Sequence, residues 1–359
     1  MSDRTLTLLL ATGATFACAS LVARVRSRAA RRLTMSGAAE PAVRWALDDD
    51  ARTAASADQA HILAQAWGSD PEIGVFGGTL CAEPFVRTTT DGLVMHGSLA
   101  YCTGGGLREG SPRPGVCLVH TAVGPQEARS FVNSFVHYYY VHESDSCTQD
   151  LYLRWRAHAL ATRGYVVLIA DLLGDPHGDG WEPAWRTREA LQQLAESPLV
   201  DASRLALVGW CFGGRAVMDA CTPAPPGLRA VVSFHGVVDG YVPHDLTATG
   251  GSEGSAGAEA VAAPPITARA LLCHAEADPF VPRDGVDACL AALGERGCRW
   301  ELQAFGAAGG ARQRTSPPPH SFTNPAQALN ENPAFSYDAR ADAASWAAAR
   351  ELLADALGS

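Results

Sequence analysis

The sequence predicts an α/β fold with a mostly parallel central sheet and helices on both faces. Between residues 114 and 305, continuous apolar runs typical of buried strands alternate with segments that have the apolar spacing of helices. Such alternation is typical of a parallel sheet that is covered on both faces. The 359 residues are 47% hydrophobic and 18% charged, which favours a globular chain with a sizeable core, in one large domain or two small ones.

The predicted elements begin with an antiparallel pair. Residues 85–90 and 93–101 flank Asp91-Gly92, a dipeptide typical of a tight hairpin turn. The strands expected after this hairpin are the apolar runs at residues 114–120, 165–170, 204–208, 229–234, 268–274 and 300–305. The expected helices are residues 151–163, 185–197, 212–221, 285–296 and 338–357.

Two longer segments interrupt the alternation. Residues 124–150 are rich in aromatic side chains and exceed the usual length of a strand-to-helix connection. We expect them to form a lid or pocket wall, or else an aromatic cluster that covers the core. Residues 247–263 are rich in Gly, Ser and Ala, which is typical of a surface loop.

The first 34 residues differ from the rest in charge. They carry six arginines and one aspartate, a net charge of +5, whereas the other 22 arginines and 37 acids give −15. Residues 5–23 are uncharged and arginines follow them, which predicts a targeting segment over residues 1–35, for import into a plastid or mitochondrion. A membrane anchor or a cytoplasmic protein are the alternatives. Residues 36–82 are expected to form a poorly defined extension, and residues 83–359 the main domain.

Composition excludes several classes of function. All 28 basic residues are arginine, so Schiff-base lysines, pyridoxal phosphate enzymes and P-loops are excluded. A formal net charge of −10 gives no support for a nucleic-acid partner. The ten cysteines include no C-x-x-C pair and have no metal or disulfide spacing. We expect most of them to be small core residues in a reducing compartment, and we expect neither a metal nor an organic cofactor.

One stretch has the layout of a nucleophile elbow. Residues 205–214 read Leu-Ala-Leu-Val-Gly-Trp-Cys-Phe-Gly-Gly, an apolar strand followed by a Gly-x-Cys-x-Gly turn that opens a helix. Gly209 and Gly213 suit a sharp turn that neighbouring backbone approaches closely. The positive end of the helix favours the thiolate form of Cys211. The alternative interpretation is a buried structural cysteine in a glycine-rich turn.

A cysteine nucleophile needs a base and a third group that orients the base. In elbow folds the acid and the histidine follow the nucleophile in chain order. Asp278 follows the strand at 268–274, and His320 lies in the loop after the strand at 300–305. Both therefore fall at the sheet edge where the elbow opens. The competing candidates are Glu276 for the acid and His120, His235 and His274 for the base.

From about Glu83 to its C-terminus, the chain resembles the dienelactone hydrolase family, a branch of the α/β-hydrolases with a cysteine nucleophile. The matching blocks are residues 114–124, 164–174, 209–214 and 278–282, and His320-Ser321-Phe322-Thr323-Asn324-Pro325. The resemblance implies an α/β-hydrolase fold, a triad of Cys211, His320 and Asp278, and an oxyanion hole made by the backbone N–H groups of Phe212 and Ala122. It also implies a carboxylic ester hydrolase of the carboxymethylenebutenolidase type, which cleaves a small ester or lactone through a covalent acyl-enzyme.

Three alternatives remain at this point: a thioesterase, a general carboxylesterase, or a non-catalytic binding protein of the same fold. The chain also departs from the family pattern. Thr121 stands where the family commonly has a glutamate, and Thr323-Asn324 stand where the best-known members have an arginine for the substrate's carboxylate. We expect Thr121, Trp210 and Asn324 to line the pocket, and we expect a substrate other than a dienelactone. A membrane partner is expected only if the N-terminal segment is an uncleaved anchor.

Overall fold

The computed structural model describes residues 78–89, 92, 94–104, 110–121, 151–172, 183–243, 264–306, 317–329 and 332–358. All of these residues lie in the compact unit Leu47–Ser359. The strands are β1 Gly78–Thr88, β2 Val94–Gly104, β3 Arg113–Val119, β4 Val166–Asp171, β5 Val200–Trp210, β6 Leu228–Phe234, β7 Arg269–Ala275 and β8 Arg299–Phe305. The helices are α4 Leu151–Ala161, α5 Pro183–Ala195, α6 Phe212–Ala220, α7 Arg283–Glu295 and α8 Ala339–Leu357, with a short 3₁₀ helix, η3, at Pro325–Leu329.

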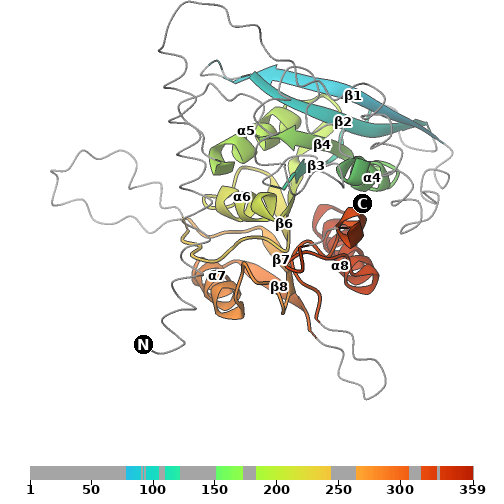
Figure 1. Ribbon diagram of the computed structural model, residues 1–359. Coiled ribbons are helices and arrows are strands. Elements are labelled where there is room, and N and C mark those ends of the chain that lie inside the picture. The colour runs from blue at the N-terminus through green and yellow to red at the C-terminus, as the bar shows by residue number, and fades with distance from the viewer. Residues whose placement is uncertain are drawn as a thin grey trace, which may run out of the picture. The chain divides into compact units, whose positions relative to one another are not determined.

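The described strands form one sheet in the order β1-β2-β4-β3-β5-β6-β7-β8 (Figure 1). β1 pairs with β2 and β2 pairs with β4 in antiparallel fashion, and every later pair is parallel. The predicted hairpin is present, since Thr88 pairs with Val94 and the N–H of Gly92 donates to Thr89 O at 3.0 Å. The mostly parallel sheet predicted from the sequence is confirmed.

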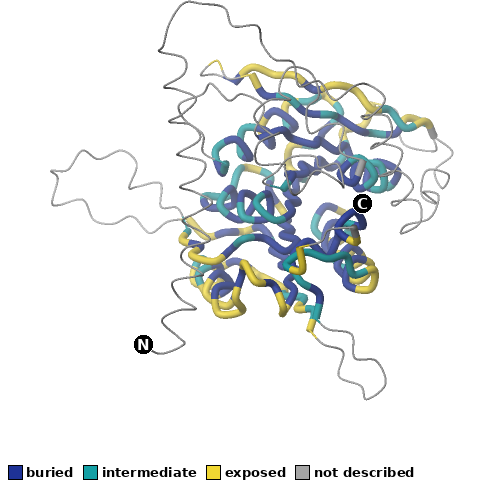
Figure 2. The backbone as a smooth tube through the Cα atoms, viewed as in Figure 1, coloured by how far each residue is buried: buried dark blue, intermediate teal, exposed yellow. Residues whose placement is uncertain are grey.

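The sheet is covered on both faces, as the alternation of strands and helices predicts. Successive side chains of a strand point to opposite faces, so β3 places Cys117 in one core and Val116 and Leu118 in the other. The first core contains side chains of α5, α6 and α7, and the second contains side chains of α4 and α8. Figure 2 shows the central strands as buried along most of their length. The continuous apolar runs in the sequence therefore reflect burial on two faces.

Some boundaries differ from the prediction. The helix expected at residues 185–197 is α5 at Pro183–Ala195, because proline suits the first turn of a helix. β5 begins at Val200 rather than at residue 204, with a register shift against β6 at Leu205/Ala206. β1 begins at Gly78, whereas the strand was expected from residue 85. The short helix η3 was not predicted.

Several predicted features lie outside the described residues. These are the targeting segment 1–35, nearly all of the extension 36–82, the aromatic-rich segment 124–150, the loop 247–263 and Ala122. The predictions made for them stay predictions. In the ranges that the structure describes, no helix combines the length and the hydropathy needed to span a bilayer.

Candidate active site

Cys211 lies in a strained turn between β5 and α6. Its φ is 54° and its ψ is −115°, a backbone conformation that side-chain-bearing residues rarely adopt and that costs about 1–3 kcal/mol. Hydrogen bonds hold this turn on both sides. The N–H of Cys211 donates to Phe234 O at 3.0 Å, and its carbonyl accepts from the N–H groups of Arg215 and Val237 at 3.2 Å each. The predicted elbow geometry is thus present, and the Cys211 side chain is half-buried at the start of α6.

The glycines of the elbow allow three backbone segments to meet. A Cβ on Gly209 would lie 2.1 Å from Gly213 O. A Cβ on Gly213 would lie 2.4 Å from the carbonyl oxygens of Val119 and His120, at the end of β3. Real Cβ atoms do not approach backbone that closely, so a larger residue at either position would displace the elbow from β3. The two glycines therefore fix where Cys211 sits relative to the end of β3.

His320 and Asp278 form a buried pair. His320 Nδ1 lies 2.6 Å from Asp278 Oδ2, and both side chains are almost fully enclosed. Asp278 follows β7 in a turn, and the N–H of Asp278 donates to Ala275 O at 3.0 Å. Its second carboxylate oxygen accepts the backbone N–H of Phe280 at 2.9 Å. Asp278 is therefore oriented by one backbone donor and in turn orients the imidazole.

The loop that carries His320 is fixed by its own backbone. The N–H of His320 donates to Ala334 O at 3.1 Å, and the N–H of Ser336 donates to His320 O at 3.3 Å. These bonds form an isolated parallel bridge between His320 and Phe335. The next residue, Ser321, has a positive φ of 60°.

His320 also contacts the nucleophile candidate. The two side chains are close enough to interact, because the charge of the Cys211 thiolate acts on the His320 imidazole. Because the Nδ1 atom of His320 is hydrogen-bonded to Asp278, its Nε2 atom is the one available to the Cys211 sulfur. Burial by itself lowers the pKa of His320, but the charge of the Cys211 thiolate and the hydrogen bonds to Asp278 and Cys211 outweigh it and raise that pKa to about 10. The structure thus brings together the three residues that chain order predicted.

Two competing candidates have other roles. Glu276 is exposed and forms an ion pair with Arg283 at 2.6 Å. His120 is fully buried, and both of its ring nitrogens are used: Nδ1 donates to Thr121 O at 2.5 Å and Nε2 accepts the N–H of Leu172 at 3.1 Å. Burial also lowers the pKa of His120. His120 is therefore a neutral structural residue at the end of β3.

Among the described residues, neither of the other two histidines is hydrogen-bonded to the carboxylate that orients a catalytic base. His274 is the next-to-last residue of β7, and burial lowers its pKa. His235 follows β6, and its Nε2 lies 2.9 Å from Thr323 Oγ1. Burial and the nearby His320 lower the pKa of His235 well below its usual range. Asp278 thus makes its imidazole hydrogen bond with His320.

Trp210 is a core residue, which corrects the expectation that it lines the pocket. It is 1% exposed. Its indole stacks on Phe234 at a centroid distance of 5.2 Å and contacts Tyr152 edge-on at 5.7 Å. Strand alternation places Trp210 on the face of the sheet covered by α4 and α8. Although Trp210 is next to Cys211 in sequence, its side chain therefore lies in the core and not in the site.

The remaining predicted residues lie near the site in different settings. Phe212 is the first residue of α6, directly after Cys211, and is half-buried. Its predicted partner in the oxyanion hole, Ala122, lies outside the described residues. Thr121 is half-buried just past the end of β3. Asn324 is half-buried, and its Oδ1 accepts the N–H of Ala326 at 3.0 Å at the start of η3.

Three aromatic rings surround His320, and we did not predict two of them as site residues. Phe280 lies edge-on at a centroid distance of 5.2 Å, Phe335 at 5.6 Å and His235 at 5.0 Å. Phe280 is 37% exposed. Its position two residues after Asp278, between Pro279 and Pro282, could have indicated a role near the acid. Phe335 has no local signal, because only the bridge to His320 brings it there.

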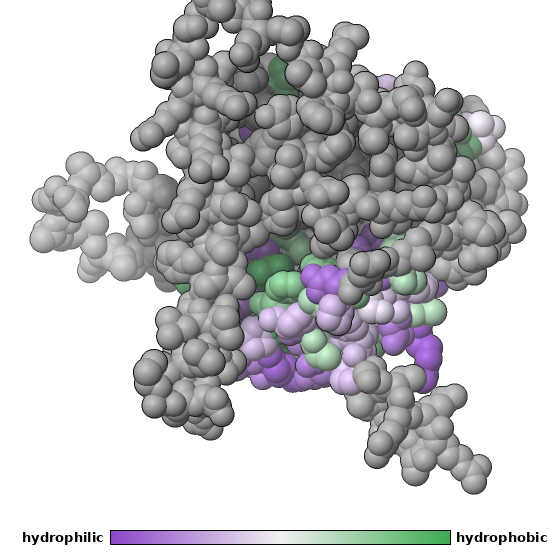
Figure 3. Space-filling model, viewed as in Figure 1, coloured by the Kyte–Doolittle hydropathy of each residue, from purple (hydrophilic) through white to green (hydrophobic). Residues whose placement is uncertain are grey.

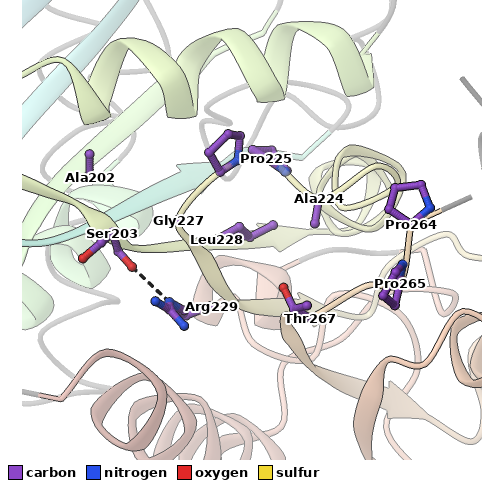
Figure 4. A pocket seen from close by; sticks show the side chains of 11 residues that line it. Ala202, Ser203, Ala224, Pro225, Gly227, Leu228, Arg229, Pro264, Pro265 and Thr267 are labelled. Atoms are coloured by element: carbon purple, nitrogen blue, oxygen red, sulfur yellow. Dashed lines mark hydrogen bonds between the residues drawn. The ribbon is translucent and has the colours of Figure 1, made fainter.

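A hollow lies away from Cys211, at another edge of the sheet. A depression of about 660 Å³ is lined by residues 202–203, 224–229, 264–265 and 267 (Figure 4). Arg229 lies at its edge and donates from Nε to Ser203 O at 3.0 Å. These residues precede or begin β6 and β7 and lie near the start of β5, so they occupy the sheet edge opposite Cys211. Ligands in such folds bind at the carboxyl ends of the strands, so the chemistry belongs to the Cys211 edge.

The comparisons with known proteins settle the family. The dienelactone hydrolase family matches residues 153–357, more than half of the chain. The chain belongs to the dienelactone hydrolase family. The predicted resemblance and the α/β-hydrolase fold are therefore confirmed, and the protein is a hydrolase by family. Within the described ranges, His, Cys, Asp and Glu form no group of three or more that could hold a metal ion.

Three relatives illustrate the match. An uncharacterized protein of Caenorhabditis elegans is 29% identical over 174 residues, which are 48% of this chain and 92% of that protein. A carboxymethylenebutenolidase homolog of Mus musculus is 33% identical over 101 residues, 24% of this chain and 40% of that protein. A dienelactone hydrolase-like promiscuous phosphotriesterase from metagenomic libraries superposes with a TM-score of 0.55 at 24% identity, covering 78% of this chain and 99% of its own. The similarity to this phosphotriesterase shows a shared fold.

Proposed function

We propose that this dienelactone hydrolase family member is a carboxylic ester hydrolase that cleaves small esters or lactones through a triad of Cys211, His320 and Asp278. The observation that carries the proposal is the position of His320, which contacts a buried carboxylate through Nδ1 at 2.6 Å and interacts electrostatically with Cys211. The strained turn that holds the half-buried Cys211 at the start of α6 supports the same role, because backbone strain of this kind collects at functional sites.

In the proposed reaction His320 first takes the proton of the Cys211 thiol. The Cys211 thiolate attacks the carbonyl carbon, and the developing oxyanion is bound by the backbone N–H groups of Phe212 and Ala122. His320 gives its proton to the departing alcohol oxygen as the tetrahedral intermediate collapses, which leaves a thioester on Cys211. His320 then takes a proton from water, the hydroxide attacks the thioester, and the acid departs as Cys211 regains its electron pair. Asp278 keeps Nδ1 protonated and Nε2 facing the sulfur.

The side chains beside His320 support an uncharged, apolar substrate group. Phe280 and Phe335 flank the imidazole, and Phe280 is partly exposed where a substrate would approach. Asn324, one residue of the pair that stands in place of the family's arginine, uses its Oδ1 to cap η3. Thr121 is half-buried beside the end of β3 and is proposed to line the pocket with Asn324. A neutral ester or lactone fits these surroundings better than an anionic one.

Replacement of Cys211 tests the proposal. We expect Cys211→Ala to lower the hydrolysis rate of p-nitrophenyl acetate by at least about a thousandfold, because no other nucleophile is positioned by His320. Cys102→Ala is the matched control, since Cys102 is buried in β2 far along the sheet, and it should keep the wild-type rate. Intact-mass measurement under rapid quench should detect an acyl group on the wild-type protein only. An alanine variant with full activity would refute the proposal.

A substrate panel separates the proposed activity from its alternatives. Alkyl esters, lactones and acyl thioesters of matched acyl length are compared by kcat/KM. A preference for esters or lactones supports the proposal, and a preference for thioesters replaces it with a thioesterase that uses the same triad. Binding of these compounds without any turnover would indicate a non-catalytic member of the fold.

A further inference from the structure

A second imidazole lies against the proposed base. His235 is buried, and its ring contacts that of His320 edge-on at a centroid distance of 5.0 Å. The same ring contacts Phe322 at 5.4 Å. The proposed reaction makes no use of His235. A buried, titratable group next to the proposed catalytic histidine therefore has no assigned role.

A chain of buried hydroxyls holds His235 in place. Its Nε2 lies 2.9 Å from Thr323 Oγ1, and that hydroxyl lies 2.7 Å from the hydroxyl of Tyr152. Thr323 comes three residues after His320 on the same loop, whereas Tyr152 belongs to α4. The chain thus ties the end of β6, the His320 loop and α4 together. All three side chains are at least nine-tenths buried, so water does not compete for these bonds.

The backbone at His235 is strained in the same way as at the triad. Among the residues that the structure describes, the non-glycine residues with positive φ are Cys211, Ser321 and His235, with values of 54°, 60° and 38°. The first is the proposed nucleophile and the second follows the proposed base. The N–H of His235 donates to Cys273 O at 2.7 Å and helps to hold its strained conformation. Strain of this kind collects at functional sites, where the fold holds a side chain in a required position.

The hydrogen bonds of His235 suit a neutral ring. An imidazolium has two N–H donors and needs two acceptors. Nε2 faces the Thr323 hydroxyl, but Nδ1 has no hydrogen-bond partner within the described part of the chain. A second positive charge would also face the His320 imidazolium across the ring contact. His235 therefore stays uncharged while its neighbour carries the proton.

We propose that His235, held by Thr323 and Tyr152, is a positioning residue that fixes the His320 imidazole in its orientation toward Cys211. This inference rests on the proposed function, since it requires His320 to act as the base. The aromatic contact restricts rotation of the His320 ring about its last side-chain bond, and the hydroxyl chain keeps His235 from moving away. Loss of the chain should therefore reduce the fraction of productive orientations and leave substrate binding nearly unchanged.

Variants of Thr323 test this inference in the full-length protein. We expect Thr323→Val to lower kcat for p-nitrophenyl acetate roughly tenfold to a hundredfold, with KM within about twofold, because small misplacements of a catalytic group have effects of that size. Thr323→Ser restores the hydroxyl and should stay within about threefold of wild type. Thr187→Val is the matched control: its buried hydroxyl donates to Pro183 O at 2.8 Å within α5, and its loss should leave kcat unchanged.

The alkylation rate of Cys211 is a second readout that depends on the orientation of His320. The rate at which iodoacetamide alkylates Cys211 near neutral pH measures the paired thiolate, and we expect Thr323→Val to lower it along with kcat. Tyr152→Phe removes only the far end of the chain and should lower kcat several-fold, which keeps the test available if Thr323→Val does not fold. Thermal melts accompany every variant.

The outcomes separate this inference from the proposed function. A folded Thr323→Val protein with wild-type kcat, or with a raised KM alone, would overturn the positioning role. Thr323→Ser with the same loss as Thr323→Val would overturn it too, because the hydroxyl would then not matter. Full activity of His320→Ala would instead overturn the proposed function. Inactivity of His320→Ala together with wild-type Thr323→Val would overturn only the role of His235.

Discussion

At the scale of single residues, the chemistry depends on the charge of His320. Burial acts to remove its proton, yet the Cys211 thiolate and the hydrogen bonds to Asp278 and Cys211 raise its pKa to about 10. A His320 with this pKa is protonated at neutral pH and has a proton ready for the leaving group.

Replacing Asp278 should move the alkaline limit of activity. A group whose pKa is raised keeps its proton up to that pKa, so kcat/KM for an alkyl ester, which needs a protonated His320, should fall as pH rises through about 10. Asp278→Asn removes the carboxylate charge that faces His320 Nδ1. This lowers the pKa of His320 and shifts the alkaline limb of the profile to lower pH. Glu276→Gln is the control, since Glu276 pairs with Arg283 at the surface. The measurement is the pH profile of kcat/KM, and an unshifted limb in Asp278→Asn contradicts the triad.

The sequence was sufficient to find the residues whose order along the chain reflects their order on the sheet. Cys211, Asp278 and His320 each follow a parallel strand, and such strands end at one edge. Residues placed by long-range contacts could not be found in this way. Phe335 reaches His320 through an isolated bridge, and His235 depends on Thr323 and Tyr152.

At the scale of elements, strand interiors were easier to predict than their ends. β3 and β4 are buried along nearly their whole length, so their apolar runs carry a clear signal. β8 is an edge strand with a mostly exposed pattern and gives a weaker signal. The described surface near α7 and β8 mixes hydrophilic and hydrophobic residues (Figure 3). Glycines occur where elements approach each other closely. Replacing them tests whether the elbow has room for a side chain.

Two glycine-to-alanine substitutions in helices should have opposite effects. Gly213→Ala places a Cβ 2.4 Å from Val119 O, so the backbone must shift, and we expect a loss of more than about 2 kcal/mol of stability together with loss of hydrolysis. Gly294→Ala in α7 meets only Trp300 Nε1 at 3.5 Å and should stabilise the protein by about 0.5–1 kcal/mol. Urea unfolding with parallel ester assays measures both. Equal stabilities of the two variants would mean that the elbow has room for a side chain.

At the scale of the whole molecule, one face of the sheet is closed by helices that lie far apart in sequence. α4 and α8 both pack on the core that contains Trp210 and Phe234. Between them lies a buried ion pair of Arg156 and Asp342, 186 residues apart. Tyr337, from the segment after the His320 loop, donates to the second carboxylate oxygen of Asp342 at 3.2 Å. No sequence pattern predicts such a pair, because its partners are matched only in the folded chain.

Breaking this pair on one side should cost far more than removing both partners. Asp342→Asn removes the negative charge of one partner from a buried ion pair, so we expect a loss of about 3–5 kcal/mol in the free energy of unfolding. The double variant Arg156→Met/Asp342→Leu removes both charges and should recover at least about half of that loss, since apolar replacements of buried pairs are often neutral.

The surface pair of Arg269 with Asp355 is the matched control for the buried one. Asp355 is 68% exposed, so solvent screens this contact and Arg269→Ala should cost less than about 1 kcal/mol. Guanidinium chloride unfolding of the four proteins, with wild type as reference, gives the comparison. If Asp342→Asn costs no more than Arg269→Ala, the ion pair does not hold α4 to α8, and packing in the apolar core that they share joins the two helices. If the double variant is as unstable as Asp342→Asn, the loss comes from packing volume rather than from the broken charge pair.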